Sequence, residues 1–281
     1  MPELPEVETI TSGLNAILPD RRIEKIWVRR KNLRYDFPAN LAALMEGAYF
    51  GTIIRRAKYM LIPLVRSDET RYLIAHLGMS GRFVASAPNS PNPQWDTHDH
   101  LAVDCIGGYQ LIYHDPRRFG FIIDGGNVVW QHKMIAKLGP EPIGKKACDA
   151  TYLFRQLQVS RATIKTRLLD QGVIAGLGNI YVCEALWHAG IAPTRPSNTI
   201  TRKETQKLLQ AIRAVLHRAI ADGGSSLRDY RDAEGQKGYF QTQWAVYGRA
   251  GEDCTYKGCR GKIMRMTQAG RSSFYCACHQ K

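Results

Sequence analysis

The stretch TIIRRAKYMLIPLV, at residues 52–65, decides the fold class of this chain. Similar segments follow it at TRYLIAHLG (70–78), HLAVDCI (100–106), YQLIYHD (109–115) and RFGFIID (118–124). Each segment is short, rich in β-branched and aromatic residues, and bounded by turn residues, a pattern that is typical of β-strands. These strands predict a β-sandwich or barrel of roughly 130 residues at the start of the chain.

The chain begins MPELPEVETI (1–10), which predicts the start of a helix ahead of the strands. Proline and acidic residues are favoured in a first helical turn, and Val7 and Ile10 follow at helical spacing. The helix does not explain Pro2, which lies before it and becomes the N-terminal residue once Met1 is removed.

Beyond the strands the pattern changes to helical. LGPEPIGKK (138–146) carries two prolines and two glycines without periodicity and is interpreted as a linker. In the longest helical segment, Thr201 and Glu204 form a capping box, and Gly223 ends the helix. The sequence predicts a strand-rich domain at 1–137, a linker at 138–150, a helical domain at 151–246 and a small module at 247–281.

The charge of the chain indicates a polyanionic partner. Its 281 residues include 39 Lys and Arg against 25 Asp and Glu, a net charge of +14. An excess of this size favours nucleic acid over a membrane surface, because no basic amphipathic helix with an aromatic face is present. No membrane-spanning run and no secretory signal are present, so we expect a cytoplasmic protein that does not bind membranes.

Four of the seven cysteines lie close to the end of the chain, in CTYKGC (254–259) and CACH (276–279). Two ligand pairs separated by a hairpin-length spacer are the pattern of a structural zinc site, and a module this small needs metal to fold. The fourth ligand is open: Cys276 with Cys278 leaves one residue between ligands, whereas Cys276 with His279 leaves the usual two.

Two turns between strands carry side chains that can enter a base stack. DPRRFG (115–120) places arginines beside Phe119, and HLGMSG (76–81) presents the unbranched Met79. Proteins use such side chains to wedge open or stack on bases. For each turn taken alone, simple packing is the favoured interpretation.

Two further features each have a structural and a functional interpretation. GLGNIYVCEAL (176–186) places glycines and an asparagine before a helix, which indicates either a phosphate site or a tight turn with an Asn cap. Lys58 falls within the apolar strand at 52–65. It is either an edge-strand charge that blocks aggregation or a functional amine whose pKa burial lowers.

Taken in order, these motifs resemble the bacterial formamidopyrimidine-DNA glycosylase family over the whole chain. The matching motifs are MPELPEVET, RRAKY, HLGMSG, the HDH at 98–100, DPRRFG, LGPEP, GLGNIY, GGSSLRDY with GYF, and GRSSFYC. The resemblance implies an α+β multidomain fold: an N-terminal β-sandwich with flanking helices, a helix–two-turns–helix domain and a zinc-finger β-hairpin.

The resemblance also implies residue roles. A prolyl N-terminus is a secondary amine with a pKa far below that of lysine, so Pro2 can attack a sugar carbon, with Glu3 as general acid or base. Lys58 and Arg271 match the positions that the family assigns to β- and δ-elimination. The positions implied to contact DNA are Met79, His98, Arg117, Phe119, Arg161, Lys165 and Asn179, of which Met79, Arg117 and Phe119 fill the gap left by the flipped nucleotide.

The chain departs from the family pattern at the zinc site, where four residues instead of two separate Cys254 from Cys259. The expected ligands of one structural Zn²⁺ are Cys254, Cys259, Cys276 and His279, with Cys278 as the alternative to His279.

The implied activity is that of a DNA glycosylase and AP lyase of base excision repair. It would excise 8-oxoguanine and formamidopyrimidines from double-stranded DNA. An endonuclease VIII-like enzyme for oxidised pyrimidines is the near alternative, but MPELPE and the capping-type segment at 223–240 favour purines. The third alternative, a non-catalytic damage-binding protein, is disfavoured by the presence of Pro2, Glu3 and Lys58. We expect a monomer that acts at the bacterial nucleoid.

Overall fold

The structure, a computed structural model, describes residues 2–88, 95–223 and 244–281. These residues form two compact units, and the chain passes from the first to the second between Ala136 and Lys137 and leaves the second between Ala221 and Asp222. The finer division of the chain at residues 137, 150 and 246 stays a prediction. The capping-type segment lies, apart from Gly223, outside the described residues.

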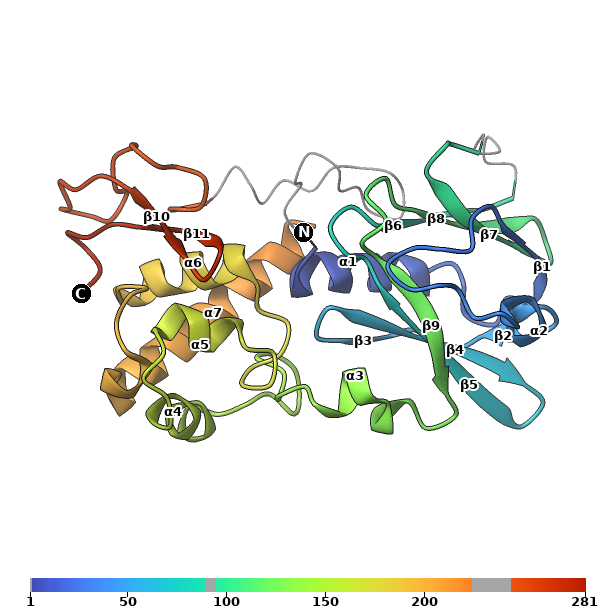
Figure 1. The fold of residues 1–281 in the computed structure, drawn as a ribbon, viewed down its shortest axis with the longest axis horizontal. Helices are drawn as coiled ribbons and strands as arrows, with labels where there is room; N and C mark the ends of the chain where they lie inside the picture. Colours follow the sequence, from blue (N-terminus) through green and yellow to red (C-terminus); the bar gives the residue numbers. More distant parts are fainter. Residues whose placement is uncertain (1, 89–94, 224–243) are drawn as a thin grey trace. The chain divides into compact units, whose positions relative to one another are not determined.

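The first unit is a β-sandwich, as predicted, made of two antiparallel sheets (Figure 1). The four-stranded sheet has the order β1-β7-β8-β6, with bounds Ile23–Val28, Asp99–Cys105, Tyr109–His114 and Arg82–Ser86. The five-stranded sheet has the order β2-β4-β5-β9, with bounds Tyr49–Phe50, Tyr59–Arg66, Glu69–His76 and Phe121–Gly126, and β3 (Ile54–Arg56) pairs with β4.

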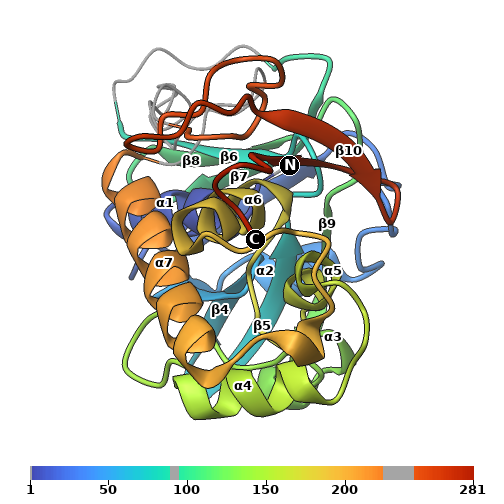
Figure 2. The ribbon, with the colours of Figure 1, turned by 90° about the vertical axis from the view of Figure 1, so that its left-hand side faces the viewer.

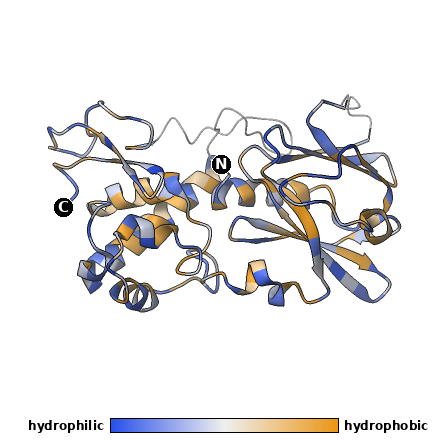
Figure 3. Cartoon of the chain, viewed as in Figure 1, coloured by the Kyte–Doolittle hydropathy of each residue, from blue (hydrophilic) through white to orange (hydrophobic). Residues whose placement is uncertain are grey.

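Helices flank this sandwich and share its core. The first helix, α1 (Leu4–Asn15), buries Val7 and Ile10 completely in a core cluster that also contains residues of both sheets. The first half of strand β9 is orange in Figure 3, because Phe121, Ile122 and Ile123 are apolar. The remaining helical elements of the unit are α2 (Leu41–Met45), η1 (Val129–Gln131) and α3 (Lys133–Ala136).

The single strand predicted at 52–65 is in fact a hairpin. Arg56, the last residue of β3, pairs with Tyr59, the first residue of β4, so Ala57 and Lys58 form a two-residue turn. Ala57 adopts a left-handed backbone with φ of 54°. The prediction that Lys58 lies inside a strand, and the edge-strand interpretation with it, is therefore wrong, because the chain reverses direction at this residue.

The second unit is helical up to its final hairpin. Its helices are α4 (Ala150–Gln158), α5 (Ile164–Leu169), α6 (Asn179–Ala189) and α7 (Arg202–Ala221), with a short 3-10 helix, η2 (Ser197–Thr199). Helix α6 packs against α5, α7 and the hairpin (Figure 2). Nearly all of its side chains are buried.

The start of α7 confirms the predicted capping box. The carboxylate of Glu204 accepts the backbone N–H of Thr201 at 2.9 Å, and the Thr201 hydroxyl accepts the N–H of Glu204 at 3.2 Å. Two backbone donors that the helix itself cannot satisfy are thus paired.

The chain ends in a β-hairpin of β10 (Met264–Gln268) and β11 (Arg271–Tyr275). Gln268 pairs with Arg271, and the turn between them consists of Ala269 and Gly270, both with positive φ. Arg271 therefore stands exposed at the tip of the hairpin.

Candidate active site and metal centre

The N-terminal residues are held by the first turn of α1. Pro2 and Glu3 are both buried, and Glu3 is only 2% exposed. The backbone N–H of Glu3 donates to the carboxylate of Glu6 at 2.8 Å. The first turn of α1 thus fixes two acidic residues, Glu3 and Glu6, directly after Pro2 in the chain.

Lys58 lies in the turn between β3 and β4, and His76 ends β5, the strand that pairs with β4. Lys58 is buried in its turn, and Tyr59 next to it pairs with His76 across the hairpin. Burial, together with the cationic Lys58 and Arg34, lowers the pKa of His76 to about 4. Nδ1 of His76 accepts the N–H of Gly78 at 2.9 Å, so a neutral ring carries its proton on Nε2.

The two turns predicted to enter DNA are locked together. A Cβ atom at Gly78 would lie 2.2 Å from the carbonyl carbon of Phe119, so only glycine allows the two backbones to approach this closely. Met79 is 37% and Phe119 is 47% exposed, and the Arg117 guanidinium lies 5.3 Å from the Phe119 ring. The two contacting turns therefore carry Met79, Arg117 and Phe119 on the same part of the first unit.

A buried carboxylate that the sequence analysis did not single out joins these turns. Asp115 is fully buried and accepts the Ser80 hydroxyl at 2.6 Å and the Gly120 N–H at 2.8 Å. The Ser80 oxygen in turn accepts the N–H of Arg117 at 3.0 Å. Both residues lie in the quoted motifs, but a sequence does not show that an acid and a serine 35 positions apart are in contact.

His98 belongs to the same region of the first unit. It is exposed, its carbonyl accepts the N–H of Asp115 at 3.0 Å, and its ring lies edge-on to that of His114 at 5.8 Å. The structure thus brings together His98, Met79, Arg117 and Phe119.

In the second unit the structure brings Lys165 and Asn179 to one carbonyl group. Nζ of Lys165 and Nδ2 of Asn179 each donate to the carbonyl oxygen of Ser272 at 2.9 Å, and Lys165 also donates to the Ser273 hydroxyl. Lys165 is only 1% exposed, so in this structure it supports the residue that follows Arg271. Arg161 is exposed in the loop between α4 and α5 and makes no part of this cluster.

The start of α6 differs from the Asn-capped turn that the sequence allowed. The N-cap residue is Gly178, whereas Asn179 is the first helical residue and its side chain reaches β11 instead. Gln171 braces the preceding loop, since its side chain accepts the N–H of Gly176 and donates to the Leu177 carbonyl.

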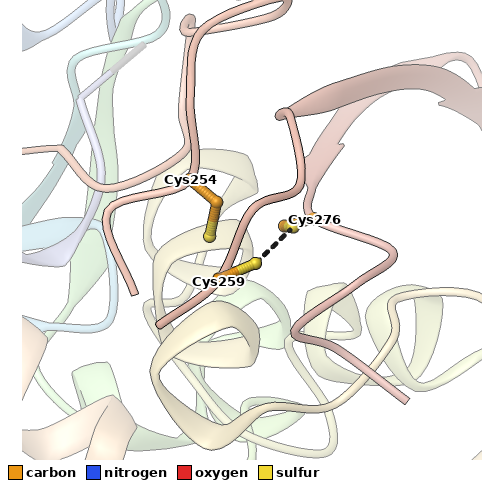
Figure 4. A group of neighbouring side chains, drawn as sticks. All are labelled: Cys254, Cys259 and Cys276. Carbon is orange, nitrogen blue, oxygen red and sulfur yellow. Dashed lines mark hydrogen bonds between the residues drawn. The ribbon is translucent and has the colours of Figure 1, made fainter. Parts of the chain in front are cut away.

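Three cysteines form a group that could hold a metal ion. The Sγ atoms of Cys254, Cys259 and Cys276 lie within 4.8 Å of one another, and those of Cys259 and Cys276 are 3.6 Å apart (Figure 4). A Cβ atom at Gly261 would lie 2.8 Å from the sulfurs of both Cys276 and Cys278. Glycine is thus required beside the sulfurs, and the thiol-rich donor set fits zinc.

The two candidates for a fourth ligand have different surroundings. Cys278 is exposed, and its sulfur lies near that of Cys276 on the Gly261 side. Nε2 of His279 is 2.7 Å from the carbonyl oxygen of Trp187, and the ring of His279 stacks on Tyr256 with centroids 3.7 Å apart. Neither residue completes the three-cysteine group as it lies in the described chain.

Comparison with known families and proteins gives consistent matches over the whole chain. Residues 1–122 match the family model for the formamidopyrimidine-DNA glycosylase N-terminal domain, and residues 138–231 match that for its H2TH domain. The formamidopyrimidine-DNA glycosylases of Cereibacter sphaeroides and Rhodospirillum rubrum are each 44% identical to this chain, over the full length of both proteins.

Solved structures of Fpg proteins also match this chain over its length. A Lactococcus lactis Fpg variant bound to DNA containing Fapy-dG has a TM-score of 0.88 and 33% identity over all of both chains. The MutM (Fpg) protein of Thermus thermophilus has a TM-score of 0.84 and 36% identity, covering 99% of this chain and 98% of that one. In the part of the chain that is described, no helix has the length and apolar character needed to span a membrane.

Proposed function

Because the chain belongs to the formamidopyrimidine-DNA glycosylase family, we propose that it excises 8-oxoguanine and formamidopyrimidines from double-stranded DNA and then cleaves the strand. The observation that carries this proposal is the locked pair of turns, since together they expose Met79, Arg117 and Phe119, side chains suited to fill the space of an extruded nucleotide. Lactococcus lactis Fpg, solved with DNA that contains an abasic site, supports the substrate class.

In the proposed reaction Pro2 supplies the nucleophile. Once Met1 is removed, its nitrogen is a secondary amine in the α-amino range, with a pKa of about 7.7–8.0, so a useful fraction is unprotonated at neutral pH. Attack on C1′ breaks the bond to the damaged base, and the base leaves with the proton of the amine. The C1′–O4′ bond then breaks as O4′ takes up a proton, so the sugar ring opens and an iminium ion links Pro2 to C1′. Glu3, adjacent in the chain and buried, would exchange the protons of this step.

Strand cleavage follows from the same iminium ion, which makes the C2′ proton acidic. Loss of that proton expels the 3′ phosphate, and a second elimination expels the 5′ phosphate. Lys58 and Arg271 match the family positions for these steps. Their cationic side chains would stabilise the departing phosphates.

The proposal is tested by single-turnover excision from duplexes that carry 8-oxoguanine, an oxidised pyrimidine or no damage. We expect rapid excision of 8-oxoguanine, slow excision of the pyrimidine and none from undamaged DNA. Pro2→Gly should bind the damaged duplex and fail to excise. Faster excision of the pyrimidine would place the chain with the endonuclease VIII-like enzymes, and binding without excision would make it a damage-binding protein.

We also propose that the three cysteines and His279 hold one structural Zn²⁺, which when bound would cross-link a module too small to fold alone. The carbonyl of Trp187 can only accept a hydrogen bond, so Nε2 of His279 must carry a proton, and Nδ1 is left with a lone pair. This arrangement supports His279 over Cys278. Metal analysis tests it: Cys278→Ala should keep one zinc per chain and His279→Ala should lose it, and the reverse result would assign Cys278.

Because the proposed substrate is genomic DNA, we propose that the protein acts at the bacterial nucleoid, in the cytoplasm.

A further inference from the structure

We propose that Trp187 is a positioning residue of the metal site, one that holds two ligands without touching the metal and thereby fastens the site to helix α6. This inference rests on the zinc site proposed above. It concerns a residue of the helical domain that no sequence motif marked as a metal or DNA contact.

The first observation is the hydrogen bond made by the indole group. Nε1 of Trp187 donates to Sγ of Cys254 at 3.4 Å. Trp187 is 7% exposed and Cys254 is also 7% exposed, so this bond is shielded from water by the cluster that contains Cys183, Val246 and Ile263. An N–H group directed at a thiolate in such surroundings stabilises its negative charge, and with it the form of cysteine that binds metal.

The second observation is the bond made by the backbone of the same residue. The Trp187 carbonyl accepts the Nε2–H of His279 at 2.7 Å. Histidine ligands commonly donate their second N–H to a carbonyl, which fixes the tautomer and the ring orientation. The ring of Tyr256 stacks on that of His279, with ring centroids 3.7 Å apart, and its centroid lies 6.2 Å from that of the Trp187 ring.

These two bonds reach both ends of the metal-binding sequence, because Cys254 opens it and His279 closes it. The end of the chain is tied to the same place, since Gln280 donates to the Ile191 carbonyl and the Lys281 N–H donates to the Gly190 carbonyl. At the other end of α6, Asn179 binds the Ser272 carbonyl. One helix therefore contacts the module at its metal-binding turns and again beside Arg271.

The test compares Trp187→Phe, which removes the indole N–H and keeps an aromatic ring, with the wild-type chain and with Trp244→Phe. Trp244 lies in the same unit, with its ring centroid 5.1 Å from that of Tyr247. Its indole N–H makes no hydrogen bond within the described residues. We expect all three proteins to bind one zinc. Trp187→Phe should bind it about 10- to 100-fold more weakly in competition with a chromophoric chelator, as loss of a ligand-supporting residue typically does.

Zinc affinity equal to that of the wild type in Trp187→Phe would overturn the inference. Absence of zinc from the wild type would instead contradict the proposed site itself, so the two failures are distinguishable.

A second measurement uses the unmodified chain, in case the variant does not fold. In protein loaded with ¹¹³Cd²⁺, the indole proton of Trp187 should show scalar coupling to the metal through the N–H···S bond. A folded, cadmium-loaded protein without this coupling would also overturn the inference.

Discussion

At the scale of single residues, one methyl group added at Gly78 should slow base excision and largely spare the strand cleavage that follows it. Its φ is 62°, and a Cβ atom there would meet the Phe119 backbone at 2.2 Å. Gly78→Ala should therefore push the two turns apart and slow single-turnover excision of 8-oxoguanine, on the order of 10- to 100-fold for a misplacement near 1 Å. Cleavage of DNA that already holds an abasic site should be affected much less, because no base has to be extruded and removed.

Gly126→Ala is the matched control for this change. Gly126 has a similar φ of 70°, but nothing lies within 4 Å of the position of its Cβ atom. It carries the backbone strain without the collision. Equal losses of excision in the two variants would attribute the effect to strain alone and contradict the proposed role of the paired turns.

His76 gives a prediction for pH dependence. Its pKa is lowered to about 4 by burial and by Lys58 and Arg34. Because protonation is easier in the unfolded chain, His76 should stabilise the fold fully above the ordinary pKa of 6.5, and this contribution should be lost as the pH falls from 6.5 toward 4. An NMR titration of the imidazole should show a midpoint near 4, whereas a midpoint near 6.5 would mean that the ring is open to water.

At the same scale, the sequence predicted which side chains are exposed better than it predicted which are buried. Met79 and Phe119 were expected to be exposed in turns, and they are. The DNA contact expected of Lys165 stays a prediction, but its burial was not foreseen, because its partners Ser272 and Ser273 lie more than a hundred positions away. Contacts across such distances depend on the whole fold and leave no local pattern.

At the scale of elements, the C-terminal hairpin depends on the amine that it buries. Lys165→Met keeps the length and apolar stem of the side chain but removes one of the two donors to the Ser272 carbonyl and the donor to the Ser273 hydroxyl. Leaving such groups unpaired costs about 1–3 kcal/mol. We expect a displaced Arg271 and a larger share of β-elimination product relative to δ-elimination product, measured on abasic-site DNA.

Lys203→Met controls for the lost charge. Lys203 lies exposed in the first turn of α7, so this change removes the same positive charge without a buried partner. If both variants shift the product ratio equally, the effect is electrostatic and the supporting role of Lys165 is contradicted.

The elements themselves were predictable where local chemistry decides them. The capping box of α7 and the apolar face of α1 are confirmed at the predicted residues. The turn at Ala57 and Lys58 was missed because neither residue is a turn former, and Ala57 adopts its left-handed backbone only because the pairing of β3 with β4 requires it. That pairing places Lys58 in a buried turn.

At the scale of the whole molecule, the net charge of +14 should dominate binding to undamaged DNA. The logarithm of affinity should fall by several units per unit of log salt concentration, as counterion release requires. Arg117→Ala should reduce this slope by about one unit and also slow excision of 8-oxoguanine.

Phe119→Ala should leave the salt slope nearly unchanged, since the lost side chain carries no charge, and yet slow excision, because holding an extruded nucleotide costs a few kcal/mol. Binding titrations at several salt concentrations and single-turnover excision measure both effects. Excision at the wild-type rate would show that Phe119 merely packs on its turn.

The central claim is that the N-terminal proline performs the chemistry, and covalent trapping tests it most directly. The protein, processed to begin at Pro2, is mixed with duplex DNA containing 8-oxoguanine in the presence of borohydride, which reduces the iminium ion to a stable link. We expect a protein–DNA adduct whose DNA-linked peptide begins at Pro2, and no adduct when Met1 is retained. An adduct mapped to Lys58 would contradict the account.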